Sequence, residues 1–414
     1  MARTDAVVLG AGIVGTSVAL HLAKRGLSVA MLDLRAPGEE TSYGNAGVIE
    51  GETVFPPTFP PGLVNLLRVG LKQATEANYH LAFLPKVAPW LFQFWLQASP
   101  ENQLAFAKAM RPLFSRAVAE HEALMTESGA LQYLRKNGWA KIYRSHTTFN
   151  RMMPELNLAD ELGIPYRMLT PREMLKLEPA LKPNFQRALF WPGAASLSNP
   201  LAVTKAYAAR YQALGGVTLI GDARTLHRNG SAWRVDTAQG PLDTQNVVMA
   251  LGPWAPDVLK PLGIDLPLGI KRGYHRHFKL AGSVPMTRPV VDPDVGYCVT
   301  PMEQGIRVTT GAEFAERDAA PTPVQFDRLM PRALEVYPLG EQVQEPTWLG
   351  KRPCFWDSRP VIGPAPGQKA MWLAYGHAHW GLTLGAVTGR LVADLVTGAT
   401  PFCDPAPYAA ERFL

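Results

Sequence analysis

The sequence is poor in cysteine. Its 414 residues include only Cys298, Cys354 and Cys403, which lie far apart, without a C-x-x-C pair or the spacing of a zinc site. We therefore expect no structural disulfide and no bound metal, as in a protein of a reducing compartment. The sequence also lacks an uncharged apolar run of about 18 residues, so no membrane-spanning helix is expected.

Targeting and nucleic-acid-binding segments are lacking as well. Arg3 precedes an apolar run, but Asp5 and the glycines that follow favour a buried strand and helix over a signal peptide. The net charge is +6 without any dense block of lysine and arginine, so we expect no nucleic-acid partner. We expect a cytoplasmic protein, and the alternative is a peripheral protein on the inner face of the cell membrane.

The overall composition is that of a globular enzyme. Hydrophobic residues make up 47% of the chain and charged residues 18%, which argues against extensive disorder. The chain is too long for one simple core, so we expect two domains that share a ligand cleft.

The most informative segment spans residues 7–33. An apolar strand leads into Gly10-x-Gly12-x-x-Gly15, a helix follows, and a second strand ends at Asp33. In this pattern the first glycine allows a tight turn, the second lets the backbone approach a pyrophosphate, and the third lets the helix lie close to the sheet. The helix N-terminus offers N–H groups to the phosphates, and Asp33 can accept hydrogen bonds from a ribose diol. The segment predicts dinucleotide binding and leaves NAD or FAD open.

The region after this segment has an unusual apolar stretch. Phe55–Pro61 is too rich in proline for a regular helix, and residues 63–131 are expected to be mostly helical. Within them, Leu81–Leu96 is strongly apolar and aromatic. We expect a buried helix pair interrupted at Pro85 and Pro89; the alternative is a surface that meets a membrane or a partner subunit.

An alternation of helices and strands follows. The expected strands are Gly138–Tyr143, Ala188–Trp191, Val217–Ile220, Ala232–Thr237, Asn246–Leu251, Arg307–Thr310 and Met371–Ala374. The expected helices are Met152–Leu162, Pro171–Leu177, Leu201–Leu214 and an amphipathic helix that ends at Leu395.

Five motifs in order along the chain resemble the D-amino-acid oxidase/dehydrogenase superfamily of FAD proteins, which includes glycine oxidase, sarcosine oxidase and bacterial D-amino-acid dehydrogenases. They are Gly10–Asp33, the loop Thr41–Gly47, the segment Val247–Trp254, a turn at Gly350–Pro353 followed by Asp357 and Pro360-x-Ile362-Gly363, and the loop Gly376–Gly381.

The resemblance implies an α/β fold, in which a Rossmann-type FAD-binding domain carries an inserted β-rich (α+β) substrate-binding domain. We expect residues 1–50, 199–267 and 348–414 to form the FAD-binding domain. Residues 51–198 and 268–347 would form the substrate domain, with a helical insert at about 63–131.

The resemblance also implies FAD as the cofactor, since no second G-x-G-x-x-G is present for NAD. Sarcosine oxidases attach their flavin to a cysteine near the G-x-R-P turn, where this chain has Gly350, so we expect noncovalent FAD. The expected cofactor-binding residues are Gly10, Gly12, Ile13, Val14, Gly15, Asp33, Leu34, Arg35, Thr41, Ser42, Asn45, Ala46, Gly47, Val48, Ala223, Gly252, Trp254, Gly376, His377, Gly381, Leu382 and Thr383.

Five residues are candidates for the catalytic site. In similar enzymes the arginine of the G-x-R-P turn clamps the substrate carboxylate, which here is Arg352. A segment resembling the R-G-Y-H of bacterial D-amino-acid and D-hydroxyproline dehydrogenases adds Tyr274 and His275, on opposite faces of a strand. Tyr297 and His379 are the other candidates.

The expected reaction is dehydrogenation of a small D-amino or cyclic imino acid, with hydride transfer from Cα to flavin N5. No protein base is required, because the substrate amine need only be unprotonated. Electrons pass to quinone, another respiratory acceptor or a dye. The alternatives are an oxygen-using oxidase of glycine- or sarcosine-type amines, or the flavin subunit of a multi-subunit complex. The expected partner is therefore a small carboxylated amine, and oligomer formation stays open.

Overall fold

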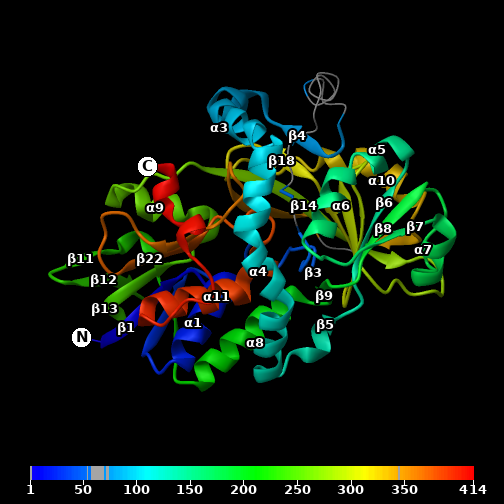
Figure 1. The fold of residues 1–414 in the computed structure, drawn as a ribbon. Helices are drawn as coiled ribbons and strands as arrows, with labels where there is room; N and C mark the ends of the chain where they lie inside the picture. The colour runs from blue at the N-terminus through cyan, green and yellow to red at the C-terminus, as the bar shows by residue number, and fades with distance from the viewer. Residues whose placement is uncertain (1, 54, 57–69, 71–73, 344–345) are drawn as a thin grey trace.

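The computed structural model describes residues 2–53, 55–56, 70, 74–343 and 346–414. Figure 1 shows two parts side by side, with β1, β13 and β22 in one and β6, β7 and β8 in the other. In this view the long helix α4 (Pro100–Glu127) runs between them. The fold is of the mixed α/β class, as predicted.

The first part is built on an eight-stranded sheet in which β1, β2, β10, β13 and β22 are parallel. The order is β10-β2-β1-β13-β12-β11, with β22 beside β13 and β21 beside β22. The strands are β1 (Ala2–Leu9), β2 (Val29–Asp33), β10 (Val217–Ile220), β11 (His227–Asn229), β12 (Ala232–Thr237), β13 (Gly240–Met249), β21 (Val361–Pro364) and β22 (Met371–Tyr375). The helices of this part are α1 (Ile13–Lys24), α8 (Pro200–Ala213), α9 (Ala255–Leu259) and α11 (Gly381–Thr397).

The second part is built on an eleven-stranded sheet of order β4-β18-β14-β17-β16-β15-β6-β8-β7, with β19 and β20 also paired to β14. The strands are β4 (Ala77–Tyr79), β6 (Trp139–Tyr143), β7 (Arg167–Leu169), β8 (Arg187–Trp191), β14 (Leu268–Leu280), β15 (Val290–Asp292), β16 (Tyr297–Met302), β17 (Gly305–Thr310), β18 (Ala312–Phe314), β19 (Leu339–Gln342) and β20 (Trp348–Phe355). The helices of this part are α3 (Leu84–Leu96), α5 (His146–Asn150), α6 (Met153–Glu161), α7 (Pro171–Leu177) and α10 (Val324–Leu334).

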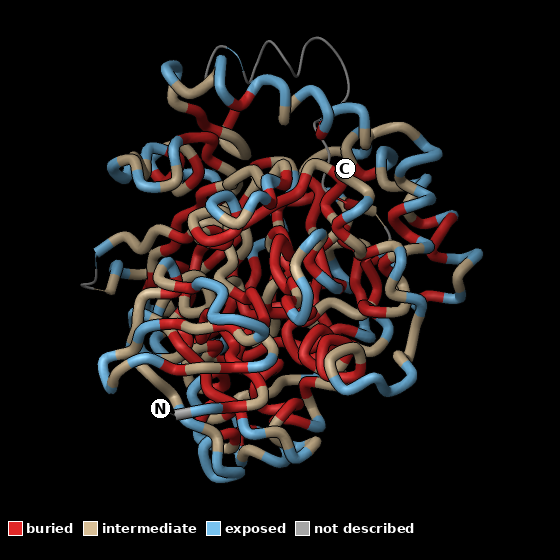
Figure 2. Tube along the Cα trace, turned by 90° about the vertical axis from the view of Figure 1, so that its left-hand side faces the viewer, coloured by how far each residue is buried: buried red, intermediate tan, exposed pale blue. Residues whose placement is uncertain are grey.

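A third, small sheet has the order β3-β9-β5. Its strands are β3 (Val48–Ile49), β5 (Leu134–Arg135) and β9 (Ala195–Leu197). Figure 2 shows the buried residues gathered in the interior, with exposed residues on the outer helices and loops. One apolar cluster packs between the first sheet and helices α1, α4, α8 and α11, and another fills the second part.

The segment Gly350–Pro353, which we expected to form a turn, lies inside strand β20 instead. Its residues pair with β14 in an antiparallel register, with Arg352 opposite Lys271. The expected domain boundary at residue 348 assigns this strand to the FAD-binding part, whereas its main-chain hydrogen bonds join it to the second sheet. The expectation of a turn failed because glycine and proline are typical of turns, whereas the pairing with β14 depends on residues far away in the sequence.

The expectation of a buried helix pair at Leu81–Leu96 was wrong. A short 3₁₀ turn precedes one continuous helix, α3, in which Pro85 occupies the first turn, where its missing N–H costs nothing. Only Val87 and Phe94 of α3 are buried, while Phe92 is 57% exposed. The helix packs by one narrow stripe, so contact with a membrane or a partner subunit stays a prediction. Among the described residues, no helix is long and apolar enough to span a membrane.

Helix α4 is joined to the first part through His121, which is fully buried. Its Nε2 donates to the carbonyl of Leu382, 2.7 Å away, and its Nδ1 accepts from the hydroxyl of Tyr207 at 2.9 Å. This arrangement requires the neutral imidazole, and burial lowers the pKa of His121 to about 4.

Acid is therefore expected to destabilise the fold through His121. Because the pKa is lower in the folded protein than the ordinary 6.5, the unfolded state binds the proton first, and stability falls as the pH drops from 6.5 towards 4. In a His121→Gln variant, the loss of unfolding free energy between pH 7 and pH 4.5 should shrink by about 2–3 kcal/mol. Thermal melts followed by circular dichroism check this. An equal loss in both proteins would contradict it.

Candidate active site

A cavity of about 1110 Å³ opens where the two parts meet. Its walls include the carboxyl ends of the parallel strands β1, β2 and β13, the edge at which open α/β sheets bind ligands. Strands β14, β16 and β20 of the second sheet contribute the opposite wall. Small-molecule sites usually occupy about 300–1000 Å³, so this cavity has room for a dinucleotide and a second small ligand.

The glycine turn after β1 lies against main chain on two sides. Gly10 has φ +106°, and a Cβ there would lie 2.5 Å from the carbonyl oxygen of Ala250. A Cβ on Gly15 would lie 1.9 Å from the carbonyl oxygen of Gly10. Strand, turn and helix therefore pack so closely that only glycine fits, and the N-terminus of α1 reaches the cavity wall at Gly12 and Ile13.

Asp33 is held in a fixed orientation at the end of β2. Its carboxylate accepts hydrogen bonds from the main-chain N–H of Ala11, at 2.7 Å, and of Arg35, at 3.1 Å. The hydroxyl of Ser42 accepts from the N–H of Ile13 at 2.9 Å, which brings the Thr41–Gly47 loop onto the start of α1. The donors and acceptors expected for an adenosine ribose and a pyrophosphate thus lie in one wall of the cavity, which fits a dinucleotide.

The Gly376–Gly381 loop and the start of α11 form another part of the cavity wall, where the second half of a dinucleotide would lie. Among the residues that the structure describes, no side chain caps the N-terminus of α11, and Gly381 and Leu382 line the cavity there. His377 is buried, its Nε2 is 3.0 Å from the hydroxyl of Thr388, and burial lowers its pKa to about 3. The ring is therefore neutral, and the uncapped helix end offers N–H groups and a positive dipole end to an anionic ligand atom.

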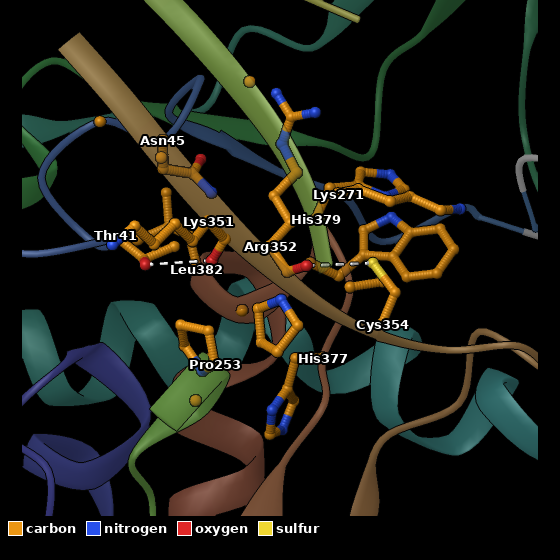
Figure 3. Close-up of a pocket in the computed structure, with 18 of the residues that line it drawn as sticks. Thr41, Asn45, Pro253, Lys271, Lys351, Arg352, Cys354, His377, His379 and Leu382 are labelled. Carbon is orange, nitrogen blue, oxygen red and sulfur yellow. Dashed lines mark hydrogen bonds between the residues drawn. The ribbon is translucent and has the colours of Figure 1, made fainter. Parts of the chain in front are cut away.

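Arg352 extends from β20 into the cavity (Figure 3). Its guanidinium donates to the carbonyl oxygens of Gly311, at 2.9 Å, and Thr310, at 3.1 Å. It lies across Gly273 of β14, where a Cβ would be 2.2 Å from Nη2. Within the described part of the chain Arg352 forms no salt bridge, and burial lowers its pKa. A partly buried guanidinium that is fixed in place and forms no salt bridge with described residues is suited to bind a carboxylate.

Two further basic side chains lie close to Arg352. Lys271, opposite it on β14, places its ammonium 3.5 Å from the ring centre of Phe94, and burial lowers its pKa to about 8. His379 lies beside both in Figure 3. Burial, followed by the charges of Arg352, Lys271 and Lys141, lowers the pKa of His379 to about 3, so its ring is neutral.

The two candidate tyrosines line the cavity, but their hydroxyls already have partners. The Tyr274 hydroxyl donates to Glu313 at 2.6 Å and accepts from Arg272 at 3.0 Å. The Tyr297 hydroxyl donates to Asp292 at 3.1 Å, in a buried network with Arg144. In the structure these hydroxyls hold the second sheet together.

His275 does not line the cavity. Its Nδ1 is 3.3 Å from the carbonyl oxygen of Gly44, and its ring stacks on Trp348 with 4.8 Å between ring centres. It shares this face with His277, and the two ring centres are 5.0 Å apart. The expected substrate contact through His275 is therefore wrong for this structure, because the imidazole packs under the Thr41–Gly47 loop.

Most of the other predicted residues meet in this single cavity. Gly15, Gly47 and Thr383 do not line it. Each of them is next in sequence to a residue that does line it. The Thr383 hydroxyl also donates to the carbonyl of Val48, a residue of the cavity wall, at 3.1 Å. Those that line it are Gly10, Gly12, Ile13, Val14, Asp33, Leu34, Arg35, Thr41, Ser42, Asn45, Ala46, Val48, Ala223, Gly252, Trp254, Tyr274, Tyr297, Arg352, Gly376, His377, His379, Gly381 and Leu382.

The sequence indicated no role for several charged residues of the wall, among them Glu50, Glu52 and Lys271. The two glutamates follow the Thr41–Gly47 loop, in a segment without helix or strand periodicity. What could have indicated their place in the site is that two acidic residues follow a loop expected to contact the cofactor. No metal-binding group of histidine, cysteine or acidic residues occurs among the described residues.

The main chain also connects strand β20 to the loop before α11. Cys354 at the end of β20 forms an isolated antiparallel bridge with His377. The N–H of Ala378 donates to the carbonyl of Pro353 at 2.8 Å. Arg352 is therefore next in sequence to a residue in direct main-chain contact with the loop before α11.

Comparison with known proteins agrees with this geometry. The family model described as FAD dependent oxidoreductase matches residues 5–395. The chain is 29% identical to the D-amino-acid oxidase of Bradyrhizobium diazoefficiens and 28% identical to the D-amino acid dehydrogenase of Xanthobacter autotrophicus, with 98% of each chain covered in both cases.

Solved structures share the fold. Glycine oxidase from Geobacillus kaustophilus superposes with a TM-score of 0.78 at 22% identity over the whole of both chains. L-proline dehydrogenase from P. horikoshii superposes with a TM-score of 0.75 at 18% identity, covering 100% of this chain and 98% of that one.

Proposed function

The chain belongs to the family of FAD-dependent oxidoreductases, and we propose that it oxidises the carbon–nitrogen bond of a small D-amino acid or cyclic imino acid. It is an oxidoreductase of the D-amino acid oxidase/dehydrogenase type. We further propose that the electrons pass to quinone or another respiratory acceptor.

The observation that carries the proposal is the partly buried guanidinium of Arg352 in the cavity wall, which forms no salt bridge with described residues. A carboxylate bound by two parallel N–H···O bonds is fixed in both position and rotation, so the substrate Cα is held in one place. Two main-chain carbonyls hold the guanidinium in position before substrate arrives, which lowers the entropy lost on binding.

The residues proposed to hold FAD noncovalently are the Gly10–Gly15 turn, Asp33, the Thr41–Gly47 loop and the N-terminus of α11. FAD, when bound, supplies an acceptor for the hydride that leaves Cα. Gly350 offers no side chain for a covalent link at the position where sarcosine oxidases have a cysteine. The uncapped end of α11 stabilises negative charge on the bound cofactor.

The test is an anaerobic screen for flavin bleaching with both enantiomers of the amino acids, including proline and the hydroxyprolines. We expect bleaching by D-amino acids or by D-enantiomers of the cyclic imino acids. Bleaching by L-enantiomers alone would contradict the proposed stereochemistry, and the absence of bleaching by any carboxylated amine would contradict the substrate class.

The electron acceptor is tested in air. Turnover with dyes or quinones and without peroxide supports a dehydrogenase. Peroxide release at a comparable rate would favour the second candidate, an oxygen-using oxidase of glycine- or sarcosine-type amines. An isolated chain without activity, although it retains flavin, would favour a subunit of a larger complex.

Gly273→Ala is expected to displace the Arg352 guanidinium while the protein still folds. The new Cβ would lie 2.2 Å from Nη2, and the end of a side chain can move where main chain cannot. Such a misplacement should lower kcat/KM by about 10- to 100-fold. Anaerobic flavin reduction gives this value, and the ratio of flavin to protein absorbance should stay unchanged. Gly193→Ala, where a Cβ meets nothing within 4 Å, is the control. Unaltered kinetics in Gly273→Ala would contradict the assigned position of Arg352.

A further inference from the structure

Two glutamates face the cavity immediately after β3. Glu50 and Glu52 both line it, and Glu52 is only 4% exposed. The N–H of Glu50 lies 3.4 Å from the hydroxyl of Thr383, which itself donates to the Val48 carbonyl. The pair is therefore attached to the same wall as the start of α11, close to the proposed cofactor site.

Each carboxylate is held by a different tryptophan. The indole N–H of Trp139 donates to Glu52, and the indole N–H of Trp380 donates to Glu50 at 3.2 Å. Glu52 also accepts from the N–H of Gly51 at 2.7 Å, and Glu50 accepts from the hydroxyl of Thr53. These bonds fix the carboxylates but leave lone pairs for another donor, because two carboxylate oxygens offer about four acceptor positions.

Neither glutamate has a cationic partner in the part of the chain that the structure describes. The charged groups around them are Lys141 of β6, which pairs with Glu155 of α6 at 3.5 Å, and Arg111 of α4, which donates to the carbonyl of Gly51 at 2.7 Å. Cys298 of β16 also faces Glu50, and burial raises the pKa of its thiol to about 12, so it is neutral. Lys141 and Arg111 act on Glu50 and Glu52 through their charge and without a salt bridge, so a proton or a ligand cation would further stabilise the buried Glu52 and the partly exposed Glu50.

The titration of the pair agrees with this. Burial, followed by repulsion from Glu50, raises the pKa of Glu52 to about 8. Burial also raises the pKa of Glu50. Two carboxyl groups this close titrate as a unit, so near neutral pH the pair holds a proton.

Trp380 and His379 connect the pair to Arg352 through a series of neighbouring contacts. Trp380 donates to Glu50, the rings of Trp380 and His379 are 4.1 Å apart, and the charge of Arg352 acts on His379. One cavity thus carries a guanidinium at one position and an acidic pair at another, and neither forms a salt bridge within the described residues. This charge distribution is complementary to a zwitterion with a carboxylate and an ammonium group.

We propose that Glu50 and Glu52 form the subsite for the substrate amine and that Glu52 accepts its proton. This inference rests on the proposed function. In the step itself an N–H bond of the substrate ammonium breaks and an O–H bond forms on Glu52, with no change of oxidation state. The neutral amine then keeps its lone pair, which assists departure of the hydride from Cα. The proton passes to solvent when the product leaves. The pair thereby supplies the base that the sequence alone did not require.

The experiment compares amines with carboxylates of the same shape that lack nitrogen. The pairs are glycine with propionate, D-alanine with isobutyrate, and D-proline with cyclopentanecarboxylate. Anaerobic flavin reduction gives kcat/KM for the amine, and the flavin spectrum gives Kd for the carboxylate. The variants are Glu52→Gln and Glu50→Gln. Glu178→Gln is the matched control, a fully buried glutamate that accepts from the N–H of Thr287 at 3.0 Å outside the cavity.

Glu52→Gln should lower kcat/KM for the amine by about 100-fold or more, the usual contribution of a positioned base. The Kd of the matching carboxylate and the flavin content should change little, whereas loss of Arg352 would weaken both ligands. An equal effect of Glu52→Gln on amine and carboxylate would overturn the proposal, as would an effect no larger than that of Glu178→Gln. If no amine bleaches the wild-type flavin, it is the proposed function that fails.

The pH profile supplies a readout that a structural role would not change. In the wild type, kcat/KM should rise with pH as Glu52 ionises, near its pKa of about 8. In Glu50→Gln the repelling charge is absent, so the pKa of Glu52 falls. The rise of kcat/KM, which is the acidic limb of the profile, should then move to lower pH with the same substrate. A limb that stays in place in Glu50→Gln would contradict the coupling of the pair.

Discussion

Replacing Arg352 by alanine is expected to cost about 2–4 kcal/mol of binding to a carboxylated amine, or roughly 30- to 1,000-fold in kcat/KM. The loss should fall mainly on KM, because the guanidinium binds the carboxylate in the ground state as well as in the transition state. Flavin should stay bound, since Arg352 extends from β20, in the wall opposite the glycine turn after β1.

Arg352→Lys tests the geometry of the same contact. Lysine keeps the positive charge but loses the two parallel N–H bonds, so most of the deficit should remain. Arg135→Ala is the matched control, because the Arg135 guanidinium also donates to a carbonyl, that of Pro301 at 2.9 Å, outside the cavity wall. Full activity in the Arg352→Ala enzyme would refute the carboxylate clamp.

The second large effect is expected at the glycine turn. Gly10→Ala should yield protein with little or no FAD, its affinity weakened by about 100-fold or more, because two penalties add. The residue has φ +106°, which alanine adopts only under strain, and its Cβ would lie 2.5 Å from the carbonyl oxygen of Ala250. The carbonyl belongs to the main chain and cannot rotate away from the new Cβ. The turn must therefore shift away from the sheet, which displaces the N–H groups that would bind the phosphates.

The ratio of flavin to protein absorbance after purification measures this effect, together with FAD titration of the apoprotein. Gly26→Ala separates the two penalties. Gly26 also has a positive φ, +83°, but a Cβ there meets nothing within 4 Å. That variant should keep its FAD and lose only some stability. If Gly10→Ala retained FAD as well as Gly26→Ala does, the close packing of the turn would not be what positions the phosphates.

The sequence predicted best where a local pattern determines the outcome. The bounds of α7 and β10 were predicted without error, because a capping threonine with proline starts the helix and a short apolar run after glycines forms the strand. Most of the cavity-lining residues around the glycine turn and the two loops were found in the same way, since glycine and small polar residues mark close approach of backbone.

The predictions failed where the structure of a segment depends on residues that are distant in the sequence. Nothing within Gly350–Pro353 shows that it pairs with β14, about 80 residues earlier in the sequence, so proline and glycine suggested a turn. Leu81–Leu96 is apolar enough for a core, but its neighbours cover only one stripe of the helix. Glu50 and Glu52 carry no motif, and only the fold places the indole N–H groups of Trp139 and Trp380 beside them. Residues 57–61 of the proline-rich segment lie outside the described part of the structure.

The course of β20 has a consequence for how the specificity of this enzyme can change. Arg352 lies near the C-terminal end of the strand, and the next two residues, Pro353 and Cys354, are bonded to the loop before α11. A few covalent bonds and main-chain hydrogen bonds therefore set the distance from the carboxylate clamp to the proposed flavin position. A longer substrate cannot be accommodated by moving the two parts of the protein apart without breaking that strand. Changes in substrate size must come from side chains on the walls farther from Arg352, and insertion of a single residue into β20 would turn the arginine to the other face of the sheet.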